Sequence, residues 1–139
     1  MLEDFIKANN LKAEILSAES QKTDAESTIK PLLFISPEKE PVLVIILAGR
    51  KIDEKKLCST AETSSLRIAE PIEALEITGY AMDVMPPISI YGVQAVIDKE
   101  VMEKEFVFAP AGKQGLVLKI SPKEILACNE GAKVEKICL

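Results

Sequence analysis

The sequence has no histidine, and its 139 residues include only three cysteines. Without histidine, the Ser-His-Asp and Cys-His forms of nucleophilic catalysis are excluded, and so are zinc sites built on imidazole. Cys58, Cys128 and Cys138 lie far apart and form no Cys-x-x-Cys pair. Their odd number argues against a disulfide framework and fits a reducing compartment. Many of the usual catalytic mechanisms of enzymes are therefore excluded for this chain.

Long hydrophobic segments are also missing. The longest apolar run covers residues 42–48, whereas about 20 residues are needed to cross a bilayer. The first residues, Met1-Leu2-Glu3-Asp4, carry acid where a secretory signal carries base, and no apolar segment follows them. We therefore expect a cytoplasmic protein that neither spans a membrane nor is exported.

A surplus of positive charge is lacking as well, since the formal net charge is -5. Such a chain has no overall attraction to phosphate, so any contact with nucleic acid must use a local patch and should be weak and salt-sensitive. Arg50, Lys51, Lys55 and Lys56 form the obvious basic cluster. The alternative interpretation of this cluster is a solvated helix face.

What the sequence does contain is enough apolar material for one core. Hydrophobic residues make up 47% of the chain, and this length suits one domain better than two. We therefore expect a single domain over residues 1–139. Residues 29–36 and 42–47 are two β-rich runs separated by a Pro-bounded turn, so we expect them to form paired central strands.

The remaining pattern predicts many short strands with helices between them. Asn10, Gly79 and Gly131 suit helix ends, and Ser121-Pro122-Lys123-Glu124 has the form of a capping box with proline at the first helical position. Helices are predicted over 2–9, 53–60, 71–78 and from 122, and further strands over 12–17, 66–68, 93–98, 105–109, 115–120 and 132–139. Regular βαβ alternation is absent, so the pattern favours an α/β fold with a mixed, curled, barrel-like sheet and peripheral helices.

Lys30 is the most informative residue, because it is the one strong side-chain donor in the apolar run Ile29-Lys30-Pro31-Leu32-Leu33-Phe34-Ile35. A long cation in such a strand needs a partner or a cleft. It could fix a substrate carbonyl, phosphate or ribose hydroxyl. The alternative, which the spacing alone favours, is an edge-strand lysine whose stem covers apolar surface while its ammonium reaches water, and Pro31 supports an edge position.

The segment from Gly79 to Pro87 could form the opposite wall of such a cleft. An irregular backbone can aim several N–H groups at a developing oxyanion, and Pro86-Pro87 would stiffen it. The alternative is an ordinary helix-to-strand connection. The Ala111-Gly112 turn is similarly open to two interpretations, since hairpin glycines often satisfy only backbone torsions.

The order and spacing of these segments resemble the YbaK/ProX family of aminoacyl-tRNA deacylases. These are editing domains that hydrolyse mischarged tRNAs and also occur inserted in bacterial prolyl-tRNA synthetases. The resemblance covers nearly the whole chain from Lys30 onward. Its blocks are Ile29-Lys30-Pro31-Leu32-Leu33-Phe34, residues 44–50, 65–69 and 78–80, Pro87-Ile88, Val96-Ile97-Asp98 and residues 108–112.

The resemblance implies that Lys30 is the site lysine, contacting the aminoacyl ester and the terminal adenosine. It also implies that residues 83–87 offer N–H groups to the ester carbonyl, and that the attacking water is assisted by the ribose hydroxyl of the tRNA. No metal or cofactor would then be needed, and an aminoacyl-tRNA synthetase is a further candidate partner. The residues expected to bind substrate beside the catalytic Lys30 are Gly79, Asp83, Val84, Met85, Pro87, Ala111 and Gly112.

The chain also departs from the family pattern. Asp83 and Val84 stand where the family has glycines, Ser89 replaces a later glycine, and Pro110 replaces an asparagine. A carboxylate at position 83 would repel an oxyanion, and a Cβ there restricts positive φ. The helix that normally precedes the lysine strand is reduced to about residues 23–27.

Three functional hypotheses follow. The leading one is a free-standing deacylase that clears a mischarged small amino acid. The second is a non-catalytic relative that binds aminoacyl-tRNA ends, a nucleotide-like ligand or a protein partner. The third is an unrelated hydrolase with Cys58 or Cys128 as nucleophile, activated by a lysine. Under the leading hypothesis, the Lys30 ammonium should open into the same cleft as residues 83–87.

Overall fold

The computed structural model describes residues 2–19 and 26–139. The predicted helical turn at residues 23–27 falls largely outside this part of the chain. Every other predicted helix and strand is present within a few residues of its expected bounds, and helix α4 and the 3₁₀ turn η1 were not predicted. In chain order the elements are α1 (Leu2–Ala8), β1 (Glu14–Ser17), β2 (Ile29–Ile35), β3 (Pro41–Leu47), α2 (Glu54–Ala61), β4 (Arg67–Ile68), α3 (Pro71–Thr78), η1 (Met82–Val84), β5 (Gln94–Asp98), α4 (Lys99–Met102), β6 (Val107–Pro110), β7 (Leu116–Ile120), α5 (Pro122–Cys128) and β8 (Lys133–Glu135).

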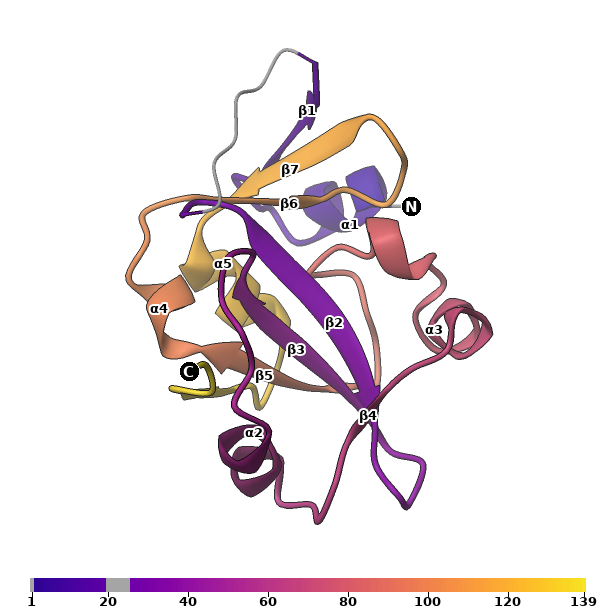
Figure 1. Ribbon diagram of the computed structural model, residues 1–139. Coiled ribbons are helices and arrows are strands. Elements are labelled where there is room, and N and C mark those ends of the chain that lie inside the picture. Colours follow the sequence, from indigo (N-terminus) through magenta and orange to yellow (C-terminus); the bar gives the residue numbers. More distant parts are fainter. Residues whose placement is uncertain (1, 20–25) are drawn as a thin grey trace.

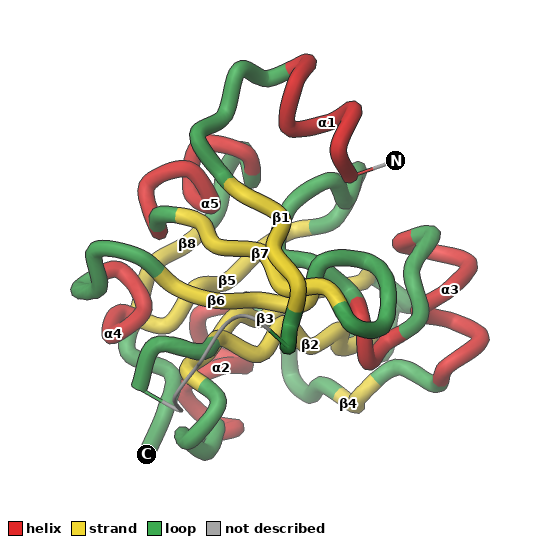
Figure 2. Tube along the Cα trace, turned by 90° about the horizontal axis from the view of Figure 1, so that it is seen from above, coloured by secondary structure: helices red, strands yellow, loops and turns green. Residues whose placement is uncertain are grey.

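The strands form two sheets, with orders β1-β7-β6 and β4-β2-β3-β5-β8. The second is mixed, because β2 runs antiparallel to β3 and β4, whereas β3, β5 and β8 are parallel. β2 and β3 are thus the paired inner strands that the sequence predicted. Both figures show the three-stranded sheet crossing the start of β2, with α3 and α4 on opposite sides of the molecule (Figures 1 and 2).

The expected single curled, barrel-like sheet is therefore wrong. Among the described residues, the isolated parallel bridge between Thr28 and Phe108 is the one pairing between the two sheets, and Pro31 explains why pairing stops there. The Leu33 carbonyl accepts a bond from Ala69 on the β4 side, so the backbone of Pro31, two residues earlier, points to the same edge. Proline has no N–H to offer a neighbouring strand there. β6 accordingly leaves β2 after one bridge, and β4 joins the same edge further along.

Side chains alternate across β2 and place its two faces in different surroundings. Ile29, Leu33 and Ile35 point into the main core, where Met85 and Ile88 also pack. Residues on the other face pack against a second apolar cluster that includes α2 and the C-terminal segment. The same alternation puts Lys30, which is exposed, on this outward face.

The predicted start and end of α3 are confirmed, whereas α5 ends at Cys128, three residues before Gly131. α3 begins at Pro71 and ends at Gly79, which has a left-handed φ of 80°. At α5 the Ser121 hydroxyl accepts the N–H of Glu124 as predicted. The return half of the capping box is not formed, because the Glu124 carboxylate accepts instead the N–H of Lys12, at 2.8 Å. None of the described helices is long and apolar enough to cross a bilayer.

Candidate functional site

The segment that follows α3 is a short, tightly bonded connection. Gly79 closes the helix, and the Thr78 hydroxyl then donates to the Ala74 carbonyl at 2.7 Å and accepts the N–H of Tyr80 at 3.1 Å. The turn η1 comes next, and residues 85–90 after it are buried. Hydrogen bonds from the Thr78 side chain therefore fix the start of this segment.

Two hydrogen bonds hold η1 to the turn between β6 and β7. The Gly112 N–H donates to the Val84 carbonyl at 2.8 Å, and the Gln114 amide donates to the Asp83 carboxylate at 2.7 Å. Gly112 has a φ of +86°, and a Cβ added to it would lie 3.0 Å from the Tyr80 ring. Glycine is therefore favoured at position 112 both by its torsion and by this close contact.

The far end of the segment is anchored in the core. The Asn129 side chain donates to the Pro87 carbonyl at 2.9 Å, and the Tyr80 hydroxyl donates to the Ser89 hydroxyl at 3.1 Å. Ser89 has a φ of 68°, which is the conformation that glycine adopts most easily. The serine at this position keeps a left-handed backbone and gains a bond to Tyr80.

The backbone N–H groups of residues 83–87 are fewer than expected. Pro86 and Pro87 have none, and the N–H of Val84 donates to the Ala81 carbonyl at 3.1 Å. Met85 is fully buried, so Asp83 is the residue of this segment whose N–H remains as a candidate to meet a substrate carbonyl.

Two hollows flank the contact between η1 and the β6–β7 turn. The first, which we call the Tyr80 hollow, has a volume of about 240 Å³. The second, the Asp83 hollow, has a volume of about 300 Å³ and extends to the start of β2. The Tyr80 hollow is lined by Leu2, Glu3, Ile15, Gly79, Tyr80, residues 111–113 and Leu116, and the Asp83 hollow by Ala18, Thr28, Ile29, Asp83, Val84, residues 108–110 and residues 113–117.

The expected substrate-binding residues divide between these hollows. Gly79, Ala111 and Gly112 line the Tyr80 hollow, whereas Asp83 and Val84 line the Asp83 hollow. Met85 and Pro87 are buried behind them. The fold thus brings the loop after α3 and the β6–β7 turn together, although they are about 30 residues apart in the sequence.

Lys30 lies beside the Asp83 hollow but is not among the residues that line it. Thr28, which does line it, precedes Lys30 by two residues, which is about 7 Å along a strand. Thr28 and Ile29 both line the hollow although they point to opposite sides of the strand. The exposed Lys30 side chain shares the side of Thr28 and lies opposite Ile29 and the core that contains Met85. Its place on an inner strand is confirmed, and the meeting of its ammonium with residues 83–87 stays a prediction.

Lys113 and Gln114 were not picked out from the sequence. Lys113 lines both hollows, and Gln114 lines the Asp83 hollow while donating to Asp83. Both follow directly after Ala111-Gly112. The sequence indicated only that these two residues lie in a glycine-containing hairpin turn. It did not indicate which distant loop this turn contacts.

The other proposed sites receive less support from the structure. Burial, with a smaller effect of Glu124, raises the pKa of the Cys128 thiol, and burial together with Asp98 raises that of Cys138 to about 12. Such thiols stay protonated at neutral pH, which is unfavourable for a nucleophile. In the basic cluster, Arg50 is paired with Glu100 at 3.0 Å. Among residues 2–19 and 26–139, no group of three or more potential metal ligands is present.

Sequence comparisons connect this geometry to tRNA editing. The model of the family described as "Aminoacyl-tRNA editing domain" matches residues 12–128. A proline–tRNA ligase from Lactobacillus delbrueckii subsp. bulgaricus is 33% identical over 97 residues, which are 69% of this chain and 17% of the ligase. The chain therefore spans about a sixth of that relative's length. A protein from Enterococcus faecalis named "Putative Cys-tRNA(Pro)/Cys-tRNA(Cys) deacylase EbsC" is 23% identical over 128 residues, covering 91% of this chain and 77% of the relative.

Solved structures show the same fold. A protein described as "a putative trans-editing enzyme for prolyl tRNA synthetase" superposes with a TM-score of 0.83 at 22% identity, over 99% of this chain and 94% of that one. The family match includes β2 with Lys30, the segment after α3 and the β6–β7 turn. The chain belongs to the aminoacyl-tRNA editing domain family.

Proposed function

We propose that this chain is an aminoacyl-tRNA deacylase that acts in trans, hydrolysing the ester of a mischarged tRNA as a single domain. The observation that carries the proposal is the Asp83 hollow, because it joins the start of β2, the loop after α3 and the β6–β7 turn. These are the three segments in which the sequence places the site residues.

In the proposed reaction, water attacks the ester carbonyl carbon and the bond to the ribose oxygen breaks. The free amino acid leaves, and the ribose oxygen takes a proton to become a hydroxyl. The Lys30 ammonium would hold the substrate at the mouth of the hollow, and the N–H group of Asp83 would face the developing oxyanion. The ribose hydroxyl beside the ester would orient the water, so positioning replaces a histidine base.

Asp83 would then have a positive role. An aminoacyl ester carries an α-ammonium next to its carbonyl, and a carboxylate at the mouth of the hollow attracts it. The bond from Gln114 fixes the Asp83 carboxylate at 2.7 Å, so its charge is held in one place. The small volume of the hollow, about 300 Å³, suits the ester of a small amino acid.

The second candidate is a relative that binds the aminoacyl-tRNA end without hydrolysing the ester. Asp83 is also the observation that favours it. A carboxylate beside a developing oxyanion raises the energy of the transition state, and the family's glycine at this position avoids that cost.

The test measures ester loss from a panel of mischarged tRNAs, with Lys30→Ala and Lys39→Ala compared with the natural protein. Lys39 is an exposed lysine in the turn between β2 and β3, so it controls for the loss of one charge. We expect Lys30→Ala to lose at least a hundredfold in kcat/KM while its unfolding midpoint changes little, because an exposed lysine contributes little to the core. Full activity per folded molecule in Lys30→Ala would refute the assigned role.

A further inference from the structure

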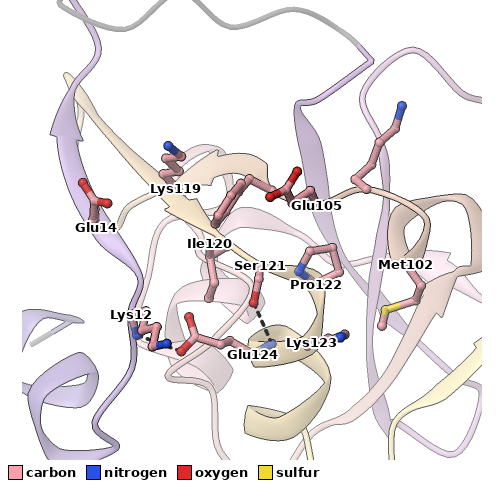
Figure 3. A pocket seen from close by; sticks show the side chains of 12 residues that line it. Lys12, Glu14, Met102, Glu105, Lys119, Ile120, Ser121, Pro122, Lys123 and Glu124 are labelled. Atoms are coloured by element: carbon pink, nitrogen blue, oxygen red, sulfur yellow. Dashed lines mark hydrogen bonds between the residues drawn. The ribbon is translucent and has the colours of Figure 1, made fainter.

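A third hollow lies on the outward face of the three-stranded sheet, and none of the proposed site residues lines it. We call it the Phe106 hollow; its volume is about 550 Å³. Residues from β1, β7, the start of α5 and the connection between α4 and β6 surround it (Figure 3). Its size is within the range of about 300–1,000 Å³ that is typical of ligand sites.

The apolar part of the Phe106 hollow includes a half-exposed aromatic ring. Met102, Phe106 and Pro122 contribute apolar surface, and Phe106 is 47% exposed. The Lys119 ammonium lies 4.8 Å from the centre of the Phe106 ring, a cation–π arrangement. An exposed ring beside a cation is the combination that binds a nucleic-acid base together with its phosphate.

Charges around the Phe106 hollow have a small positive excess in a chain that is acidic overall. Four lysines and three glutamates line it: Lys12, Lys104, Lys119, Lys123, Glu14, Glu105 and Glu124. Glu124 is engaged by the backbone N–H of Lys12 (Figure 3). Glu14 lies opposite Lys119 in the register of β1 and β7. No ion pair joins any of the four lysines to another of the described residues. The ammonium groups can therefore meet phosphates, that of Lys119 from its position over the Phe106 ring.

The Phe106 hollow and the Asp83 hollow lie along the same pair of strands, β6 and β7. Phe108 lines the Asp83 hollow and pairs in register with Lys119, which lines the Phe106 hollow. Phe106 precedes Phe108 by two residues, so the two hollows follow each other along the outward face of β6 and β7. A nucleic-acid strand whose end occupies the Asp83 hollow would pass over the Phe106 hollow.

We infer that the Phe106 hollow binds the RNA strand that carries the ester, with a base against Phe106 and phosphates on Lys119 and neighbouring lysines. This inference rests on the proposed function, and it places tRNA on the sheet face instead of on the cluster of Arg50, Lys51, Lys55 and Lys56. The positive excess is small, so the contact is weak and depends on salt.

The test uses a fluorescent RNA hairpin that ends in single-stranded CCA, with binding followed by anisotropy at several salt concentrations. We expect Phe106→Ala and Lys119→Ala each to weaken binding about tenfold. Lys119→Ala should also reduce the slope of log K against log salt by about 0.7, the value for one phosphate contact to a single strand. Phe106→Ala should leave the slope unchanged.

Lys39→Ala is the matched control, because it removes one exposed lysine from the opposite end of β2 and should bind RNA like the natural protein. Unchanged RNA affinity in both Phe106→Ala and Lys119→Ala would overturn the inference. So would a loss of affinity confined to Lys55→Ala and Lys56→Ala, which would place the RNA on the basic cluster. The RNA hairpin carries no aminoacyl ester, so its binding does not depend on whether the protein hydrolyses esters. A failure of the proposed function would therefore be seen in the deacylation assay and not in this binding assay.

Discussion

The contact between Gly112 and Tyr80 gives a sharp test of how the site is held, because the same turn contains its own control. Gly112 and Gly115 have nearly the same backbone torsion, with φ of +86° and +83°. A Cβ on Gly112 would lie 3.0 Å from Tyr80, whereas a Cβ on Gly115 would meet no atom within 4 Å. Substituting each by alanine therefore separates the torsional cost from the cost of the contact.

The expected magnitudes follow from these two terms. Alanine in the left-handed region costs about 1–2 kcal/mol, and this term applies equally to both glycines. Overpacking adds about 1–3 kcal/mol, and it applies only to Gly112→Ala. The Tyr80 ring cannot move away freely, since its hydroxyl is bonded to Ser89. We expect Gly115→Ala to lower the free energy of unfolding by about 1–2 kcal/mol and Gly112→Ala by about 2–5 kcal/mol.

The assay is equilibrium unfolding in urea, combined with deacylation per folded molecule. Gly112→Ala should slow deacylation at least tenfold, because it displaces the N–H that holds the Val84 carbonyl, while Gly115→Ala should retain most of the activity. A Tyr80→Leu background shortens the side chain that the new methyl meets, so it should reduce the difference between the two alanine variants. Equal stability losses for Gly112→Ala and Gly115→Ala in the natural background would refute this reasoning.

Two further predictions concern charged residues. Asp83→Gly should lower kcat/KM about fivefold if the carboxylate holds the substrate's ammonium, whereas a rise of about a hundredfold would favour the non-catalytic relative. Glu38→Gly, which removes an exposed carboxylate from the turn between β2 and β3, is the control. The other prediction concerns Glu73. A hydrogen bond from Arg67, and then one from the Glu70 backbone, lower the pKa of the Glu73 carboxyl from 4.5 to about 2. A lowered carboxyl pKa contributes stability that is complete above pH 4.5 and is lost as the pH falls toward 2. Glu73→Gln should therefore lose less stability than the natural protein over that interval in acid titrations followed by circular dichroism, and equal losses would contradict the assignment.

Local signals in the sequence determined most of the secondary structure. Alternating apolar residues indicated β2 and β3, and Pro71 with Gly79 marked the limits of α3, because strand period and helix-end chemistry depend on neighbouring residues alone. The resemblance based on Lys30 and residues 78–88 also identified the family correctly. The two short elements that were missed, α4 and η1, contain four and three residues, too few to show a period.

The tertiary structure decided what these elements do together. The sheet divides in two because Pro31 faces an edge that no local pattern identifies, and Glu124 bonds Lys12, 112 residues away, instead of completing its own helix cap. The Asp83–Gln114 bond and the Phe106 hollow likewise join segments that are distant in the sequence. Residue spacing reveals which side chains share a face of one element. It does not reveal which faces meet, because that depends on how the whole core packs.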